Sequence, residues 1–326
     1  LEAALEAGFS AAGVDVMDIG QVTTPMLYFA TYELGTGSGA AVTGSHNPPE
    51  YNGLKMMVGG DTLYGEAIQD LYRSVCAAQS GAAAAVAVDA KATDFAAEDT
   101  GARGPQPARR GKISSVDINE RYIARVVSDI KLARGMKIAV DCGNGVAGPF
   151  AQALFTRLGC EVVPLFCEVD GNFPNHHPDP ADPHNLEDLI RVLAETDCEI
   201  GLAFDGDGDR LGIVTRDGQT IYPDRQMMLF AKDVLSRQPG GTIVFDVKCS
   251  QRLAPYIRDC GGQPLMFKTG HSLIKAQMKA IDSPLGGEMS GHVFFKERWY
   301  GFDDGTYAGC RLLEILSHSD DANQVL

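Results

Sequence analysis

Apolar and polar positions along the chain predict strands and helices in alternation. Residues 134–166 (RGMKIAVDCGNGVAGPFAQALFTRLGCEVVPLF) and residues 239–267 (PGGTIVFDVKCSQRLAPYIRDCGGQPLMF) follow the same order. Each has a β-branched run, a turn, an amphipathic helix, a glycine-containing corner and a second apolar strand. This order is typical of a β-α-β unit, which favours parallel or mixed sheets with helices packed on them. The repetition predicts related α/β domains.

The first twenty residues, LEAALEAGFSAAGVDVMDIG, contain only half of such a unit. They read as a helix, a glycine corner and a strand, without the strand that precedes the helix in a β-α-β unit. We therefore expect a strand upstream of Leu1 and interpret the chain as truncated at this end.

A stretch with few large apolar residues marks the first domain boundary. Residues 77–111 are rich in Ala, Gly and Pro and cannot supply a core, so they are interpreted as a linker or a long surface excursion. A helix is predicted over residues 117–131, with Asp117 as N-cap and Glu120 as its capping-box partner.

A second boundary is predicted near residues 219–221, after the strand LGIVT and the turn RDGQ. The prediction is thus three α/β domains of about a hundred residues each around a central cleft. Their predicted ranges are 1–116, 117–219 and 220–326.

The charge balance limits the classes of partner. The chain has 326 residues, with 28 Lys and Arg against 43 Asp and Glu, and a formal net charge of −15. An acidic surface argues against nucleic-acid binding and against attachment to anionic membranes. No apolar run reaches the roughly 20 residues that cross a bilayer, and no basic-then-apolar leader opens the chain. An anionic substrate must be attracted locally by Lys, Arg and His.

The cysteines show no metal-binding or disulfide pattern. None of the eight forms a CxxC pair, and several lie in apolar, strand-like runs such as VDCGNG. This usage is typical of reduced core thiols, which predicts a cytoplasmic protein.

The stretch DGDGDR, residues 205–210, is the first candidate for chemistry. It follows the apolar run EIGLAF, and Asp205, Asp207 and Asp209 alternate with glycines. Three carboxylates at this spacing repel one another unless a cation lies between them. An EF-hand is excluded because Arg210 and Arg216 occupy the loop positions that need Gly and Glu. Hard oxygen ligands favour Mg²⁺, and a solvated acidic turn is the alternative.

Two further glycine-containing turns differ in what they predict. GNGVAG, residues 143–148, matches the dinucleotide pattern GxGxxG. The acidic residues near the end of the next strand, Glu168 and Asp170, fall beyond the usual spacing, which favours a tight turn without a cofactor. GEMSGH, residues 287–292, gathers Glu288, Ser290 and His292 on one short loop, a combination that suits a ligand rich in hydroxyl groups.

Three further positions offer groups that can receive a phosphate. Lys55 follows the serine loop, Lys248 ends the strand TIVFDV, and His271 precedes a predicted helix in KTGHSLIK. Each by itself reads as solvated surface. Beside a metal cluster, they could together bind a phosphate dianion.

The stretch TGSHNPP, residues 43–49, holds Ser45 between a glycine and a histidine and then excludes helix with two prolines. No GxSxG elbow accompanies this serine. If Ser45 carries a phosphoryl group, one Mg²⁺ can bridge that group and the three aspartates. We interpret the stretch as a frame that presents a phosphoserine.

TGSHNP, DGDGDR and GEMSGH, in this order, resemble the motifs of the α-D-phosphohexomutases. The GEMSGH form and KTGHSLIK are most similar to the bacterial phosphomannomutase/phosphoglucomutase members. The resemblance covers nearly the whole chain apart from residues 77–111. It implies transfer of a phosphoryl group from a phosphoserine to a hexose phosphate, through a 1,6-bisphosphate, in a monomer that acts on small-molecule sugar phosphates. The implied cofactors are Mg²⁺ and glucose 1,6-bisphosphate as activator or intermediate.

The resemblance also implies a role for each motif residue. The implied metal ligands are Ser45, through its phosphate, and Asp205, Asp207 and Asp209. The implied catalytic residues are Ser45, His46, Lys55, Arg210, His271 and His292, of which Lys55, His271 and His292 are the candidates for moving protons. The implied substrate-binding residues are Lys248, His271, Glu288, Met289, Ser290, Gly291 and His292.

The chain departs from the family pattern at both ends. Members have an N-terminal active-site segment upstream of the position of Leu1. They also have a fourth domain with a phosphate-gripping loop, beyond the position of Leu326. We therefore expect a fragment with weak substrate affinity and poor turnover. Within the family, phosphoglucosamine mutase is the alternative; from other classes, a nucleotide-dependent oxidoreductase and a Ca²⁺-binding module remain open. The sequence does not decide between mannose and glucose.

Overall fold

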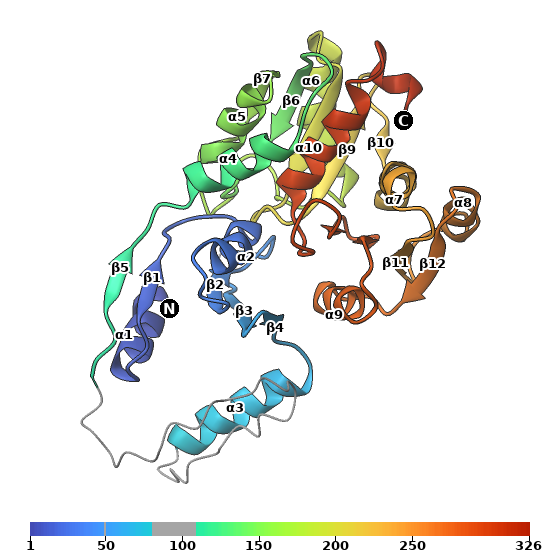
Figure 1. Ribbon diagram of the computed structural model, residues 1–326. Helices are drawn as coiled ribbons and strands as arrows, with labels where there is room; N and C mark the ends of the chain where they lie inside the picture. The colour runs from blue at the N-terminus through green and yellow to red at the C-terminus, as the bar shows by residue number, and fades with distance from the viewer. Residues whose placement is uncertain (49, 80–108) are drawn as a thin grey trace. The chain divides into compact units, whose positions relative to one another are not determined.

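A computed structural model describes residues 1–48, 50–79 and 109–326 (Figure 1). Most of the predicted linker, residues 80–108, lies outside the described residues, while residues 77–79 belong to a helix. The chain divides into two packed units. One combines Leu1–Asp18 with Leu63–Val116, and the other combines Ile19–Thr62 with Asp117–Leu326.

The first unit contains the helix and strand predicted for the first twenty residues. Its elements are α1 (Glu2–Ala11), β1 (Val16–Asp18), α3 (Glu66–Gln79) and β5 (Ile113–Ser115). Strands β1 and β5 pair in parallel, with Val16 opposite Ile113. Ser10 Oγ donates a hydrogen bond to Gly111 O at 2.8 Å, which ties the end of α1 to the segment before β5.

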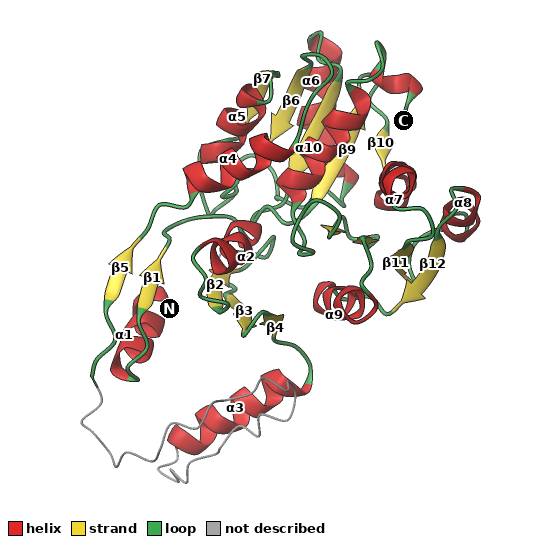
Figure 2. Ribbon diagram, viewed as in Figure 1, coloured by secondary structure: helices red, strands yellow, loops and turns green. Residues whose placement is uncertain are grey.

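The second unit contains a five-stranded mixed sheet in the order β10-β9-β8-β6-β7 (Figure 2). Its strands are β6 (Lys137–Asp141), β7 (Glu161–Leu165), β8 (Ile200–Phe204), β9 (Leu211–Thr215) and β10 (Thr220–Ile221). Strands β6, β7 and β8 run parallel, and β9 and β10 are antiparallel to their neighbours. With α5 (Gly148–Arg157) between β6 and β7, the predicted β-α-β unit is confirmed.

Alternate residues of this sheet face different helices. Leu202 lies in the core that includes α5 and α10 (Gly305–Leu316), whereas the backbone of Gly201 lies against Leu189 of α6 (Glu187–Glu195). The 3₁₀ turns η1 (Pro183–Leu186) and η2 (Ala322–Gln324) precede α6 and follow α10. The sheet is therefore covered on both faces, which explains why its central strands are apolar throughout.

A second mixed sheet has the order β12-β11-β13-β14. Its strands are β11 (Thr242–Asp246), β12 (Gln263–Phe267), β13 (Leu285–Gly287) and β14 (Val293–Phe295), and its helices are α7 (Pro223–Arg237), α8 (Leu253–Asp259) and α9 (His271–Ile281). Val244 packs with Ile274 and Met278 of α9, whereas Phe245 belongs to the core that includes α7 and α8. The second predicted β-α-β unit, β11-α8-β12, is also confirmed.

A three-stranded antiparallel sheet, β2-β3-β4, accompanies helix α2 (Thr24–Glu33). Its strands are β2 (Gly39–Thr43), β3 (Gly53–Val58) and β4 (Asp61–Thr62). Helix α2 is buried from Thr24 to Thr31, and its Phe29 ring contacts Tyr122 and Trp299. Residues 19–62 therefore pack with the later part of the chain.

The predicted helix over residues 117–131 is α4, Asn119–Asp129, but its predicted capping box is wrong. The N-cap is Ile118, and the Asp117 carboxylate instead accepts the backbone N–H of Asn119 at 2.9 Å. Glu120 pairs with Arg157 of α5. A long-range partner has replaced the local capping interaction.

The thiol prediction agrees with the structure. All eight cysteines lie in the described part of the chain and are free thiols, five of them buried. Among the described residues, no helix is both long and apolar enough to cross a bilayer.

A buried arginine ties α10 to α7 and β14. Arg311 has no exposed side-chain area, and its guanidinium contacts Glu297 and Asp233 at 2.8 Å each. It also lies 4.4 Å from the Phe295 ring centroid. Burial alone would lower the pKa of Arg311, but these acidic partners and Tyr307 hold it above its ordinary value.

We expect Arg311→Met to lower the free energy of unfolding by about 3–5 kcal/mol, because it leaves two carboxylates in a buried place without their cation. Calorimetry would show a lower unfolding midpoint. The control is Arg191→Met, which removes an exposed pair with Asp188 and is expected to change little. Equal midpoints for the two variants would contradict this account.

Candidate active site

The aspartates of DGDGDR lie directly after β8, at the carboxyl end of the sheet. Asp205, Asp207 and Asp209 are 0%, 4% and 0% exposed, and each has a carboxylate oxygen within 4.8 Å of such an oxygen of the other two. Burial and the two neighbouring carboxylates raise the pKa of Asp205 well above its ordinary value. The cluster therefore cannot hold three uncompensated negative charges.

Lys55 of β3 supplies one compensating charge. Its Nζ donates to Asp207 Oδ2 at 2.7 Å and to Asp209 Oδ2 at 2.5 Å. Burial favours the neutral form of both partners, but the ion pair outweighs it. The pKa of Lys55 is well above its ordinary value, and that of Asp209 is well below.

The donor set fits a hard divalent cation. Asp207 Oδ1 and Asp209 Oδ1 are buried and have no hydrogen-bond partner within the described part of the chain. Carboxylate oxygens that lack a donor are the ligands that Mg²⁺ and Ca²⁺ take in proteins. The three aspartates would hold the cation, and Lys55 would share their charge with it.

Ser45 lies beside the same cluster. Its Oγ donates to Asp205 Oδ2 at 3.1 Å and lies 3.4 Å from His46 Nδ1. The backbone N–H of Ser45 donates to Thr43 Oγ1 at 2.8 Å, and its φ of 53° is in the left-handed region. A non-glycine residue in that region needs local support, and the bond to Thr43 supplies part of it.

The serine loop and the aspartate loop touch through their backbones. A Cβ added at Gly206 would lie 2.2 Å from the carbonyl oxygen of Ser45, so only glycine allows this approach. Thr24 and Thr43 donate from their hydroxyls to Asp207 Oδ2 at 2.7 and 3.0 Å. Two segments more than 150 residues apart are thus held together by direct contacts.

The GEMSGH loop reaches the cluster through His292. His292 Nε2 lies 3.2 Å from Asp209 Oδ1, and its Nδ1 lies 2.8 Å from Ser290 Oγ and 3.4 Å from Glu288 Oε2. Burial by itself lowers the pKa of this ring, but Asp209 and Glu288 outweigh it and raise the pKa of His292 to about 10.

Arg210 lies between the aspartate loop and the GEMSGH loop. Its backbone N–H donates to Asp205 Oδ1 at 3.1 Å, and its Nε lies 3.4 Å from His292 Nε2. Burial and the nearby Arg210 lower the pKa of His46, which faces Asp179 at 4.0 Å. The guanidinium thus contacts His292 and also lies 3.7 Å from Asp205 Oδ2, the oxygen that accepts from Ser45 Oγ.

The remaining predicted residues differ in their placement. The His271 ring stacks on His292, with centroids 5.5 Å apart and planes at 18°. Met289 donates its backbone N–H to Asp246 Oδ1 at 3.2 Å. Lys248 is exposed and, within the described residues, has no hydrogen-bond or ion-pair partner. The structure brings together Ser45, His46, Lys55, Asp205, Asp207, Asp209, Arg210, His271, Glu288, Ser290 and His292.

Sequence reasoning missed several residues that contact this set. Thr24, Thr43, Lys275 and Asp303 have common residue types and no metal-ligand spacing. Two of them lay within or beside recognised motifs, Thr43 before the serine of TGSHNP and Lys275 at the end of KTGHSLIK. Nothing comparable pointed to Thr24, which begins a helix that was not predicted.

The GNGVAG turn is not available to a dinucleotide. The backbone N–H groups of Gly143, Asn144, Gly145 and Val146 all donate to protein oxygens, including Gly206 O from Val146 at 3.0 Å. A pyrophosphate site needs such groups free. The turn instead supports the aspartate loop, and the oxidoreductase alternative is not supported.

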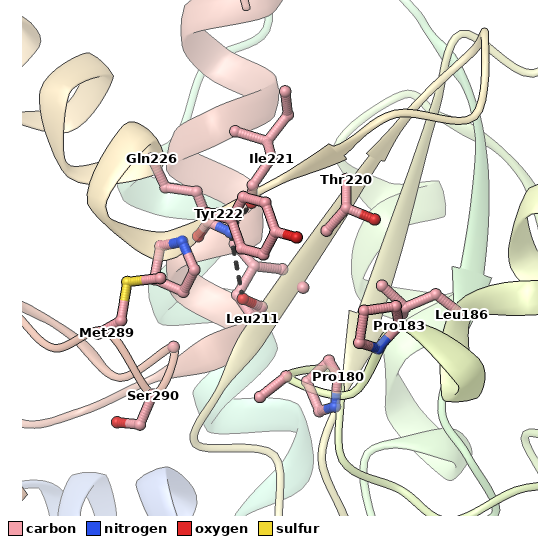
Figure 3. A pocket seen from close by; sticks show the side chains of 14 residues that line it. Pro180, Pro183, Leu186, Leu211, Thr220, Ile221, Tyr222, Gln226, Met289 and Ser290 are labelled. Atoms are coloured by element: carbon pink, nitrogen blue, oxygen red, sulfur yellow. Dashed lines mark hydrogen bonds between the residues drawn. The ribbon is translucent and has the colours of Figure 1, made fainter. Parts of the chain in front are cut away.

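A pocket of about 100 Å³ lies beside the GEMSGH loop (Figure 3). Met289 and Ser290 line one side, and Pro180, Leu186 and Tyr222 line others. Gln226 contributes its side-chain amide, which donates to Leu211 O and Ile221 O. The pocket is mostly apolar and does not include Ser45 or the aspartates.

Comparison with protein families covers most of the chain. Three models of phosphoglucomutase/phosphomannomutase α/β/α domains match it: domain I at residues 1–81, domain II at 120–218 and domain III at 222–326. The chain belongs to the phosphoglucomutase/phosphomannomutase family. This places it among the α-D-phosphohexomutases, and the predicted fold class of three α/β domains with mixed sheets is confirmed.

Individual relatives agree with this assignment. The chain is 55% identical over 322 residues to a phosphoglucomutase of Neisseria gonorrhoeae, which covers 99% of this chain and 65% of the relative. It is 53% identical over 310 residues to a phosphomannomutase/phosphoglucomutase of Pseudomonas aeruginosa, covering 95% and 61%. The chain thus spans slightly less than two thirds of the length of these relatives.

Solved structures show the same fold. A crystal structure of a phosphoglucomutase/phosphomannomutase family protein from Burkholderia thailandensis has a TM-score of 0.87 and 51% identity, covering 99% of this chain and 67% of that one. A putative phosphomannomutase from Thermus thermophilus has a TM-score of 0.79 and 25% identity, covering 99% and 69%. The phosphoglucosamine mutase alternative is not favoured by these relatives.

We expect Gly206→Ala to disturb the site without touching a proposed ligand. The new Cβ would force the Ser45 loop away from the aspartate loop, at a cost of about 1–3 kcal/mol in stability. Hydrogen exchange at residues 41–58 should become faster. Gly171→Ala is the control, because a Cβ there meets nothing within 4 Å; a similar change in both variants would contradict the close approach.

Proposed function

We propose that this chain carries the phosphoserine, metal-binding and sugar-binding parts of a phosphomannomutase/phosphoglucomutase. The reaction would be the reversible interconversion of hexose 1-phosphate and hexose 6-phosphate, with mannose or glucose as the sugar. The observation that carries the proposal is the 3.1 Å contact of Ser45 Oγ with Asp205 in a buried cluster of three aspartates. The names of the relatives support the substrate class.

In this mechanism, Ser45 carries the phosphoryl group in the resting state. A free hydroxyl of the hexose phosphate attacks phosphorus, the bond from phosphorus to Ser45 Oγ breaks, and the new bond to the sugar oxygen forms. The hydroxyl proton passes to a base. The resulting 1,6-bisphosphate turns over, and Ser45 Oγ takes the other phosphoryl group from it. At the end of the cycle, Ser45 is phosphorylated again and the hexose carries one phosphate.

The other residues bind and orient. Glu288 and Ser290 would hold sugar hydroxyls, while Lys55 and Arg210 would attract the phosphate against the negative field of the chain. Lys55, His271 and His292 are the candidates for moving the hydroxyl proton. Mg²⁺ held by the three aspartates would neutralise charge on the transferring phosphoryl group.

Ser45→Ala should abolish the mutase activity of the complete protein that contains this chain, by roughly 10⁴-fold or more, because the covalent intermediate cannot form. The assay uses glucose 1-phosphate or mannose 1-phosphate with Mg²⁺ and a trace of glucose 1,6-bisphosphate. Intact mass should also show one phosphoryl group in the native protein and none in the variant. Ser38→Ala, at an exposed serine before β2, is the matched control; activity that survives Ser45→Ala sinks the proposal.

Mg²⁺ should bind this chain and stabilise it, by about 2.7 kcal/mol when its concentration is a hundred times the dissociation constant. Asp207→Asn and Asp209→Asn should each weaken the binding measured by calorimetric titration. Asp259→Asn, at the exposed end of α8, should leave it unchanged. Tight Ca²⁺ binding with no measurable Mg²⁺ binding would favour the calcium-module alternative instead.

A further inference from the structure

A buried ion pair lies behind the histidines of the site. Asp303, in the loop before α10, has no exposed area, and the side chain of Lys275 on α9 is 9% exposed. Lys275 Nζ donates to Asp303 Oδ1 at 2.7 Å.

Three elements fix the position of this pair. The Lys275 ammonium lies 4.2 Å from the ring centroid of Tyr28 on α2, while Lys275 itself belongs to α9 and Asp303 precedes α10. Burial favours the neutral forms, yet the pKa of Lys275 is above its ordinary value and that of Asp303 is well below, because each stabilises the charge of the other. Asp303 is thus a fixed, ionised acceptor.

The second oxygen of Asp303 faces His271. Oδ2 lies 3.2 Å from His271 Nδ1, and both atoms are buried without an aligned hydrogen bond in the described residues. An ionised carboxylate can only accept. The contact is therefore favourable only when His271 Nδ1 carries a proton.

We propose that Asp303, held by Lys275, is a positioning residue that fixes His271 with Nδ1 protonated and Nε2 as the free acceptor. The contact with Asp303 also fixes the orientation of the His271 ring, and therefore its stacking on the His292 ring. The consequence for catalysis, that Nε2 accepts a proton or a hydrogen bond from a sugar hydroxyl, rests on the proposed function. The assignment of the tautomer is independent of the proposed function.

A purely structural role for the pair is the alternative. A buried ion pair is weak evidence for a stabilising role, because apolar residues of similar size in its place often stabilise the folded protein equally well. A structural role requires only that the Lys275 ammonium and the Asp303 carboxylate remain paired. A positioning role requires in addition that its loss changes the state of His271, which separates the two experimentally.

The first test is the nitrogen NMR spectrum of this chain with labelled histidine, recorded at alkaline pH. The His271 signals are assigned by their loss in His271→Asn. The expected result is a ring protonated on Nδ1. A ring protonated on Nε2, or a mixture of both forms, overturns the proposal, and this outcome needs no variant to fold.

Variants give the second test. Asp303→Asn should convert His271 to a mixture of tautomers, whereas Lys275→Arg, which keeps the charge, should retain the native form. Glu314→Gln is the control, because it removes a carboxylate from a half-buried ion pair with Arg298. It should lower the unfolding midpoint without changing His271. An unchanged His271 spectrum in a folded Asp303→Asn variant overturns the proposal.

The third test is kinetic and uses the complete protein. Asp303→Asn should lower kcat roughly 10- to 100-fold with KM within about threefold, as expected when an acid–base group loses its orientation. A change in KM alone overturns the catalytic consequence. If the wild-type protein shows no mutase activity, the proposed function fails, and the NMR result still decides the tautomer.

Discussion

The site depends on the compensation of negative charge in a buried place. Asp205, Asp207 and Asp209 sit in the interior with almost no exposure, where three ionised carboxylates cannot remain together unaided. Lys55, Arg210 and His292 face them from β3, the aspartate loop and the GEMSGH loop. The positive partners come from three distant stretches of sequence, so the cluster exists only when those stretches are folded against one another. Asp207 Oδ1 has no hydrogen-bond partner among the described residues, and Asp209 Oδ1 has only the unaligned contact with His292, so a divalent cation would bind at these two oxygens.

The fold supports this compensation by bringing chain segments to one end of a covered sheet. The aspartates follow β8. Helices cover both faces of the sheet that contains this strand, so polar groups gather at the carboxyl end of the strand. Helix α2 is buried almost entirely, which holds its threonine at Asp207 and its tyrosine over Lys275. Gly206 removes the side chain that would separate the serine loop from the aspartate loop. Apolar packing and charge pairing thus act on the same few elements.

The two histidines illustrate how similar side chains acquire different surroundings. His292 faces two carboxylates that raise its pKa, while His271 faces one carboxylate that is already paired with Lys275. The rings stack, so the position of one constrains the other. Under the proposed function, such a difference between adjacent imidazoles would provide a proton donor and a proton acceptor within one stack.

The sequence by itself determined the β-α-β units, because strand and helix periodicities are local. It also supplied Ser45, the aspartates and the GEMSGH loop as candidates, because each motif is a short run of neighbouring residues. It did not determine the cap of α4, where Arg157 draws Glu120 away from the local turn. It also offered no sign of Thr24 or Asp303, whose types are common and whose importance arises from what they face. Contacts between residues more than 150 positions apart leave no periodic trace in the chain. Only the tertiary structure could decide which carboxylate meets which cation, because that pairing is set by how buried elements pack.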